Sequence, residues 1–180
     1  MRSGLQKTVV LVGMMGAGKT AVGTALARLL GVPFLDSDAE IEQAANMSIA
    51  EIFARDGEEF FRRKETQVIE RLLQGSPGIL STGGGAFMRA ENRDLIAAHG
   101  VSVWLKASLE VLWSRVRHKD TRPLLRTADP YGTLKALAAT REPIYGLADL
   151  VIESASEQAV DDMALKVQAA LKAQPGVFKT

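Results

Sequence analysis

The stretch that decides the fold lies near the N-terminus and reads Gly13-Met14-Met15-Gly16-Ala17-Gly18-Lys19-Thr20. It fits the pattern GxxxxGK[ST], which carries meaning only between a strand and a helix. Residues 9–12 are a β-branched apolar run that predicts a strand, and the Ala- and Leu-rich residues from 19 to the stop at Gly31 predict a helix. We therefore expect a phosphate-binding loop rather than a glycine-rich turn with an incidental Lys-Thr pair.

Glycines let the backbone N–H groups of such a loop turn inward, and the helix that follows adds partial positive charge. The loop is thus expected to hold the polyphosphate of ATP. Lys19 is expected to bridge the outer phosphates and Thr20 to bind Mg²⁺. Four further residues form the nucleotide-binding part of the loop: Gly13, Gly16, Ala17 and Gly18.

Beyond the loop, β-branched runs and helical periodicity alternate along the chain. Strands are predicted at residues 33–36, 78–81, 101–105 and 150–152. Helices are predicted at 39–45, 49–55, 58–74, 90–98, 109–117, 131–143 and 156–172, with Ser48 as an N-cap and Gly57 as a break. This alternation predicts an α/β fold with a parallel sheet and right-handed connections, and residues 175–180 are expected to fray.

The composition excludes several classes of protein. The 180 residues, 47% of them apolar, suit one domain over residues 1–180. A net charge of +1 gives no general attraction to nucleic acid or anionic membranes, and the absence of cysteine excludes disulfides and thiolate metal sites and fits the cytoplasm. No apolar run approaches the roughly 20 residues that span a bilayer. We expect a soluble monomer, since no long apolar seam is evident.

Carboxylates stand at only one strand end beside the loop. Many phosphate-loop enzymes hold the metal with an Asp after a neighbouring strand, yet the strand at 78–81 runs into Thr82-Gly83-Gly84-Gly85. Asp36 and Asp38 follow the strand at 33–36, at the edge where open α/β sheets bind ligands. Asp36 is the better candidate for the metal; alternatively, both residues only cap the next helix.

The glycines at 83–85 have two interpretations. They can be a flexible turn, because glycine clusters are common in loops. Their place after a central strand favours a function, since Gly84 and Gly85 would let backbone N–H groups approach a ligand without obstruction by a Cβ atom.

The segment from Gly57 to Glu65 places Arg62 beside the apolar face of a predicted helix, with Glu65 three residues further along. Arg62 can therefore flank a site, with Glu65 holding its guanidinium, whereas Arg63 and Lys64 point more toward water. Such a charged run is more often a solvated face than a ligand site.

Three other arginines are ambiguous from their own neighbourhoods. Arg122 lies in the polar stretch 118–129, where a closing lid could bring it onto phosphates. Arg115 and Arg141 lie in predicted helices. Neither His99 nor His118 has metal-ligand spacing or a nucleophile nearby, so both are expected to be structural or surface residues.

Taken in order, six motifs of the chain resemble the shikimate kinase family over about residues 8–155: GMMGAGKT at 13–20, Asp-Ser-Asp at 36–38, GEEFFRRKE at 57–65, TGGG at 82–85, RPLL at 122–125 and REPIYGLAD at 141–149. The first motif is shared by many proteins, but the motifs at 57–65, 82–85 and 122–125 together in that order are far more selective. The resemblance implies a nucleoside-monophosphate-kinase-like, three-layer fold with a five-stranded parallel sheet. It also implies a substrate-binding segment at about 37–65 and a lid at about 118–129.

The activity implied is transfer of the γ-phosphoryl group of MgATP to the 3-hydroxyl of shikimate, in aromatic amino-acid biosynthesis. By position, Asp38 matches the family's acid that binds the ring hydroxyls and is a candidate base, and Asp36 matches the acid near magnesium. Arg62 and Arg141 match the pair that binds the substrate carboxylate, and Glu65 matches the residue that orients Arg62.

The resemblance also assigns the remaining site residues. Gly84 and Gly85 match the glycines that face substrate and γ-phosphate, Arg122 matches the lid arginine, and Arg115 matches the arginine stacked on adenine. The chain departs from the family with Met14, where phenylalanine is frequent, and in lacking an arginine at 153–155. Another small-metabolite kinase, for gluconate or a nucleotide, and a non-catalytic ligand-binding paralogue are the alternatives.

Overall fold

The structure is a computed structural model of the chain, and it describes residues 4–117, 127–154 and 158–180. Its centre is a parallel sheet of five strands in the order β2-β3-β1-β4-β5. The strands are β1 (Thr8–Val12), β2 (Phe34–Asp36), β3 (Ile79–Ser81), β4 (Gly100–Ala107) and β5 (Leu150–Ser154). Because all five run the same way, their carboxyl ends meet at one edge, where open sheets of this kind bind ligands.

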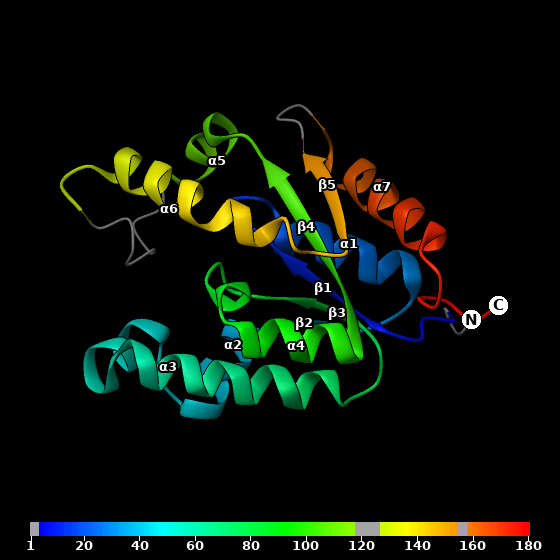
Figure 1. The fold of residues 1–180 in the computed structure, drawn as a ribbon, viewed down its shortest axis with the longest axis horizontal. Helices are drawn as coiled ribbons and strands as arrows, with labels where there is room; N and C mark the ends of the chain where they lie inside the picture. Colours follow the sequence, from blue (N-terminus) through cyan, green and yellow to red (C-terminus); the bar gives the residue numbers. More distant parts are fainter. Residues whose placement is uncertain (1–3, 118–126, 155–157) are drawn as a thin grey trace.

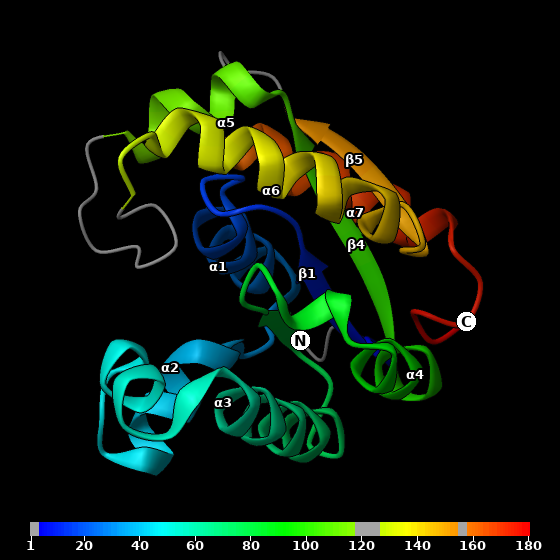
Figure 2. The ribbon, with the colours of Figure 1, turned by 60° about the vertical axis from the view of Figure 1, so that its left-hand side comes forward.

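Helices cover both faces of the sheet (Figure 1). On one face α1 (Lys19–Leu30) packs beside α7 (Val160–Ala173), and on the other lie α4 (Ala90–His99) and α6 (Pro130–Tyr145), as Figure 2 also shows. The short α5 (Leu109–Val116) packs against α6. Val9, Val10 and Leu11 of β1 are fully buried, which is expected for a central parallel strand covered on both sides. The predicted three-layer α/β architecture is confirmed.

A helical pair extends from one side of the sheet (Figure 2). It consists of α2 (Ser37–Ala45) and α3 (Ile49–Leu73), and it has a small core of its own that includes Ile41, Ile52 and Phe61. The predicted break at Gly57 is confirmed, since its φ of 85° and ψ of 171° lie outside the helical region. Ser48 caps α3 by accepting the N–H of Glu51, as predicted.

Two expectations about the C-terminal region are wrong. The last helix begins at Val160 and not at 156, because Ala159 is extended and the Asp pair at 161–162 supplies the acidic first turn that favours a helix N-terminus. The tail is not frayed either. Gly176 turns the chain back with a φ of 81°, Val177 is buried, and Phe178 forms an antiparallel bridge with Leu5.

In the part of the chain that the structure describes, no helix is both long enough and apolar enough to cross a membrane.

Candidate active site

The phosphate-binding loop between β1 and α1 has the backbone that its glycines predict. Gly13, Gly16 and Gly18 have φ values of 145°, 83° and 93°, which side chains rarely tolerate. Space imposes a second constraint: a Cβ on Gly13 would lie 2.9 Å from the Leu105 carbonyl oxygen, and one on Gly16 would lie 2.7 Å from Val116 Cγ1. The loop is therefore fixed against β4 and α5.

The Lys19 ammonium lies across this loop and donates to the carbonyl oxygens of Gly13, at 2.6 Å, and Met14, at 3.0 Å. The loop opens into a cavity of about 540 Å³. The predicted residues that line it are Gly16, Gly18, Lys19, Thr20, Asp36, Asp38, Gly84 and Arg115. Gly13 and Ala17 are not among the lining residues; both are buried within the loop.

Asp36 and Asp38 diverge because α2 begins between them. One carboxylate oxygen of Asp36 accepts the N–H groups of Asp38, at 2.8 Å, and Ala39, at 3.3 Å, so Asp36 is the N-cap of α2. Its side chain also lines the phosphate cavity together with Thr20. Capping and a metal-side position are thus compatible for Asp36, and its metal role stays a prediction.

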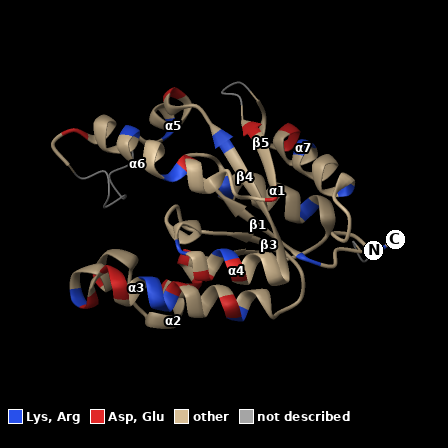
Figure 3. Cartoon of the chain, viewed as in Figure 1, with Lys and Arg blue, Asp and Glu red and all other residues tan. Residues whose placement is uncertain are grey.

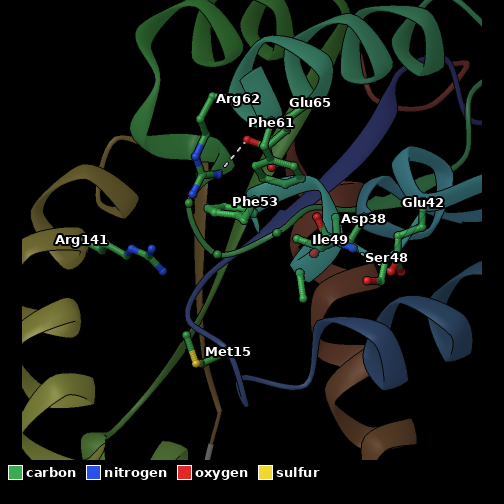
Figure 4. A pocket seen from close by; sticks show the side chains of 14 residues that line it. Met15, Asp38, Glu42, Ser48, Ile49, Phe53, Phe61, Arg62, Glu65 and Arg141 are labelled. Carbon is green, nitrogen blue, oxygen red and sulfur yellow. Dashed lines mark hydrogen bonds and ion pairs between the residues drawn. The ribbon is translucent and has the colours of Figure 1, made fainter. Parts of the chain in front are cut away.

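A second cavity, of about 510 Å³, lies beside the first, between the glycine loop at 83–85, the α2–α3 pair and α6 (Figure 4). Arg62 of α3 and Arg141 of α6 both line it, and their guanidinium groups approach it from two different helices. Four residues line both cavities: Met15, Asp38, Gly83 and Gly84. The Asp38 carboxyl therefore stands at the boundary between a phosphate site and a site with two arginines.

Each of the three glycines after β3 lies against a different charged side chain. A Cβ on Gly83 would come within 2.8 Å of the Asp38 carboxylate, and one on Gly84 within 2.8 Å of Arg141 Nη1. A Cβ on Gly85 would overlap the Arg62 guanidinium. No left-handed φ occurs at these three positions. A side chain at these positions would displace the three charged groups, so space and not backbone freedom favours glycine here.

Arg62 is held by the residue that its spacing predicted. Its Nη1 donates to Glu65 Oε1 at 2.9 Å, and its guanidinium lies 5.2 Å from the centroid of the Phe61 ring. Arg63 and Lys64 are exposed, as expected, and α3 carries intermingled acidic and basic side chains (Figure 3). The charged run is thus both a solvated face and, at one position, a wall of the cavity.

Burial dominates the electrostatics of the acids near the arginines. Glu65 is fully buried, and desolvation raises its pKa to about 7 although the Arg62 guanidinium acts in the opposite direction. Burial and the nearby Asp36 carboxylate raise the pKa of Asp38 to about 6, against the pull of Lys19 and Arg62. The site thus keeps two acids whose charge is unfavourable in the absence of a ligand.

Two buried atoms near the arginine pair lack a partner among the described residues. They are Arg141 Nη1 and Glu65 Oε2. Arg141 as a whole is only 7% exposed. A buried guanidinium with an unused donor calls for an anion, and a planar carboxylate matches the geometry of two such forks.

Apolar residues from both segments of α3 complete the second cavity. Ile49 and Phe53 lie before the break at Gly57 and Phe61 lies after it; the rings of Phe53 and Phe61 are 4.9 Å apart. The sequence analysis missed Ile49 and Phe53 as site residues. Their spacing of four was the available signal, but that spacing is equally typical of core contacts.

The remaining predicted residues are placed as follows. Arg115 Nη1 donates to the Gly16 carbonyl oxygen at 3.0 Å, which brings α5 onto the phosphate loop. Arg122 and His118 lie outside the described residues. His99 is exposed at the end of α4, and within residues 4–117, 127–154 and 158–180 no three acidic or histidine side chains are grouped to hold a metal.

Comparison with known families gives a match over most of the chain. The family model described as shikimate kinase matches residues 15–172. The chain belongs to the shikimate kinase family. The shikimate kinase of Cereibacter sphaeroides is 66% identical over 98% of this chain and 88% of that protein, and that of Ruegeria pomeroyi is 66% identical over 97% and 90%.

Solved structures of the family agree with the fold. The shikimate kinase of Acinetobacter baumannii in complex with shikimate matches with a TM-score of 0.88 and 39% identity, covering 93% of each chain. The Aquifex aeolicus shikimate kinase matches with a TM-score of 0.81 and 31% identity over 92% of this chain and 96% of that chain. A gluconokinase of Sinorhizobium meliloti, at 21% identity and a TM-score of 0.59, shares the fold alone. The family and fold implied by the sequence motifs are confirmed.

Proposed function

We propose that this chain transfers the γ-phosphoryl group of ATP to the 3-hydroxyl of shikimate. One observation carries the proposal: a phosphate-loop cavity and a two-arginine cavity share a wall that contains Asp38 and Gly84. A group held by the loop can therefore meet a hydroxyl held in the neighbouring cavity. Membership of the shikimate kinase family supports shikimate as the acceptor and ATP as the donor.

On the donor side, the loop N–H groups and the start of α1 bind the phosphates. The Lys19 ammonium, which donates to the loop carbonyl oxygens of Gly13 and Met14, is proposed to bridge the outer phosphates. Arg115, whose Nη1 donates to the Gly16 carbonyl oxygen, is proposed to stack on the adenine of the nucleotide. The segment at about 118–129 is proposed as a lid that brings Arg122 onto the phosphates and excludes water.

On the acceptor side, Arg62 of α3 and Arg141 of α6 together bind the carboxylate of shikimate. Binding there would satisfy the unused donor of Arg141. With the carboxylate fixed, Asp38 accepts a hydrogen bond from the acceptor hydroxyl and can take its proton as the bond to phosphorus forms. Its pKa of about 6 leaves it largely ionised at neutral pH, which suits that role.

Mg²⁺ fits the residues of the donor cavity. Asp36 and Thr20 offer two hard oxygen ligands there, and Mg²⁺ commonly takes one or two protein ligands and completes its shell with water and phosphate. When bound, it neutralises charge on the β- and γ-phosphates. Asp36 can serve it with the oxygen that does not cap α2.

Gluconate and nucleotide kinases of similar build are the alternative activities, because the fold is shared with a gluconokinase. The paired arginines favour a carboxylate over a nucleoside monophosphate, but gluconate also carries a carboxylate. The proposal includes a monomer in the cytoplasm with neither nucleic acid nor membrane as a partner. Size-exclusion chromatography with light scattering tests the oligomeric state.

The decisive experiment measures ADP release by the purified protein with MgATP and, in turn, shikimate, gluconate and nucleoside monophosphates. We expect turnover with shikimate only, and its loss in Lys19→Met. The exposed Lys172→Met at the end of α7 is the matched control and should retain activity. Binding of shikimate and ATP without ADP release would instead support a non-catalytic paralogue.

A further inference from the structure

Tyr145 is a fully buried residue at the end of α6 that lines neither cavity. Its hydroxyl donates to the carbonyl oxygen of Gly84, one of the residues that both cavities share. Its ring packs against Trp104 of β4, with centroids 5.7 Å apart. Tyr145 thus links three elements: it belongs to α6, its ring packs against β4, and its hydroxyl bonds to the glycine loop at 83–85.

The position of Gly84 makes this hydrogen bond relevant to the reaction. A Cβ on Gly84 would lie 2.8 Å from Arg141 Nη1, 3.8 Å from the Tyr145 hydroxyl and 3.9 Å from the Gly13 carbonyl oxygen. Gly84 is therefore enclosed by the carboxylate-binding arginine, the tyrosine and the phosphate loop. Arg141 and Tyr145 are four residues apart on α6, so they project from the same face of that helix.

The hydrogen bond to Tyr145 also sets the orientation of the peptide bond between Gly84 and Gly85. The described chain contains no cis peptide bond, and in a trans peptide the C=O and N–H groups point in opposite directions. Because the Gly84 carbonyl points to Tyr145, the N–H of Gly85 points away from Tyr145, which lines neither cavity, whereas Gly84 and Gly85 both line the acceptor cavity. Among the described residues, none accepts a hydrogen bond from the N–H groups of Gly84 or Gly85.

We propose that Tyr145 is a positioning residue, whose hydroxyl fixes the Gly84–Gly85 peptide so that its N–H faces the transferred phosphoryl group and the acceptor. The inference rests on the phosphoryl-transfer function proposed above. Without the hydroxyl, the Gly84 carbonyl loses its partner and the peptide can rotate, since glycine on both sides offers little resistance. Burial raises the pKa of Tyr145 to about 12, so the hydroxyl remains a donor throughout the working range of pH.

Tyr145→Phe tests the inference because it removes only the hydroxyl and keeps the ring against Trp104. We expect kcat to fall about tenfold, while the KM for shikimate rises at most about threefold, because Arg141 loses its hydrogen bond to the hydroxyl but still lines the cavity together with Arg62. The Kd for ADP, which depends on the phosphate loop, should not change. Tyr131→Phe is the matched control: Tyr131 is the other tyrosine of the chain, lies on the same helix, is 40% exposed and contacts Trp113.

A second measurement covers the case in which Tyr145→Phe is too unstable to assay. In the Tyr131→Phe protein, Tyr145 is the only tyrosine and can be replaced by 3-fluorotyrosine, which keeps the donor. We expect this protein to retain kcat within about threefold, and its ¹⁹F resonance to shift when shikimate and ADP are added together.

Three results would overturn the positioning role. The first is a kcat for folded Tyr145→Phe within twofold of the wild type. The second is a rise in the KM for shikimate with kcat unchanged. The third is a ¹⁹F resonance that does not shift when both ligands are added. The wild-type assay separates the two proposals: a wild-type protein that releases no ADP with shikimate overturns the proposed function, and the inference with it.

Discussion

At the scale of the residue, the contacts of Arg62 explain why an arginine, and not a lysine, is needed at this position. Its guanidinium contacts Glu65 at 2.9 Å on one side and lies beside Gly85 in the cavity on the other. A planar fork can serve both partners at once, whereas an ammonium is a point charge. We expect Arg62→Lys to raise the KM for shikimate at least tenfold in steady-state assays, with the Kd for ADP unchanged.

The control for this change is Arg63→Lys, one position along α3, because Arg63 is exposed and lies over the Phe60 ring. It should leave KM as it is. An unaltered KM in Arg62→Lys would show that the carboxylate is bound elsewhere.

Glu65 makes the stability of the ligand-free protein depend on pH. Its pKa is raised from 4.5 to about 7, and that of Asp38 from 3.8 to about 6, so the folded chain binds more protons than the unfolded chain between these values. The free energy of unfolding therefore falls as pH rises from 3.8 to about 7, by up to about 1.4 kcal/mol per pH unit for each titrating group. Urea unfolding at a series of pH values measures this slope.

Glu65→Gln should flatten the slope, most clearly between pH 6 and 7, where Glu65 acts alone. Glu70→Gln is the matched control, because Glu70 lies on the same helix and is exposed. If Glu65→Gln unfolds with the wild-type slope, the buried carboxyl is not the source of the pH dependence.

Some of these residue roles follow from spacing and others do not. The Arg62–Glu65 contact is predictable because residues three apart on a helix are neighbours. The contacts of Gly83, Gly84 and Gly85 with Asp38, Arg141 and Arg62 are not predictable, because these partners come from three different helices. The sequence also could not decide whether Asp36 or Asp38 caps α2, because the cap depends on the residue at which the helix begins.

At the scale of the element, the break in α3 shapes the acceptor cavity. Gly57 has a φ of 85° and a ψ of 171°, a region that is almost exclusive to glycine, and no atom would lie within 4 Å of an added Cβ. The cost of a side chain there is thus backbone strain alone. Phe53 and Phe61 line the cavity from the two sides of this break.

We expect Gly57→Ala to destabilise the protein by about 1–3 kcal/mol and to raise the KM for shikimate, because any relief of the strain changes the angle between the two segments. Urea unfolding and steady-state kinetics measure the two effects. Gly75→Ala, just beyond the same helix, has no left-handed φ and should cost little. A Gly57→Ala protein with wild-type stability and KM would contradict this account of the break.

Helix ends could be predicted from the sequence where a capping or helix-breaking residue marks them. Gly31, Ser48 and Gly57 marked ends that the structure has. The start of α7 was misplaced because Ser156 resembles an N-cap as much as any serine does, while the acidic pair at 161–162 gave the better signal. The pairing of Phe178 in the tail was not predicted because its partner, Leu5, is more than 170 residues away. A local sequence pattern contains no information on such a pairing.

At the scale of the whole molecule, the C-terminal tail and the two cavities lie at opposite edges of the sheet. Both cavities lie at the carboxyl ends of the strands, whereas the tail packs beside Leu5 and Gln6, just before β1 begins. Val177 is 1% exposed and belongs to the main core. The tail should therefore support the core without touching the site.

Truncation after Gln174 tests this separation. It removes the buried side chain of Val177 and the partly buried Phe178, and should lower the free energy of unfolding by about 2–4 kcal/mol. At temperatures where the truncated chain is folded, kcat and KM should equal the wild-type values. Truncation after Phe178 is the control, since it removes only the last two residues and the hydrogen bond from Lys179 to Gly4. A changed KM in the longer truncation would show that the amino edge of the sheet is coupled to the site, which no contact of the tail predicts.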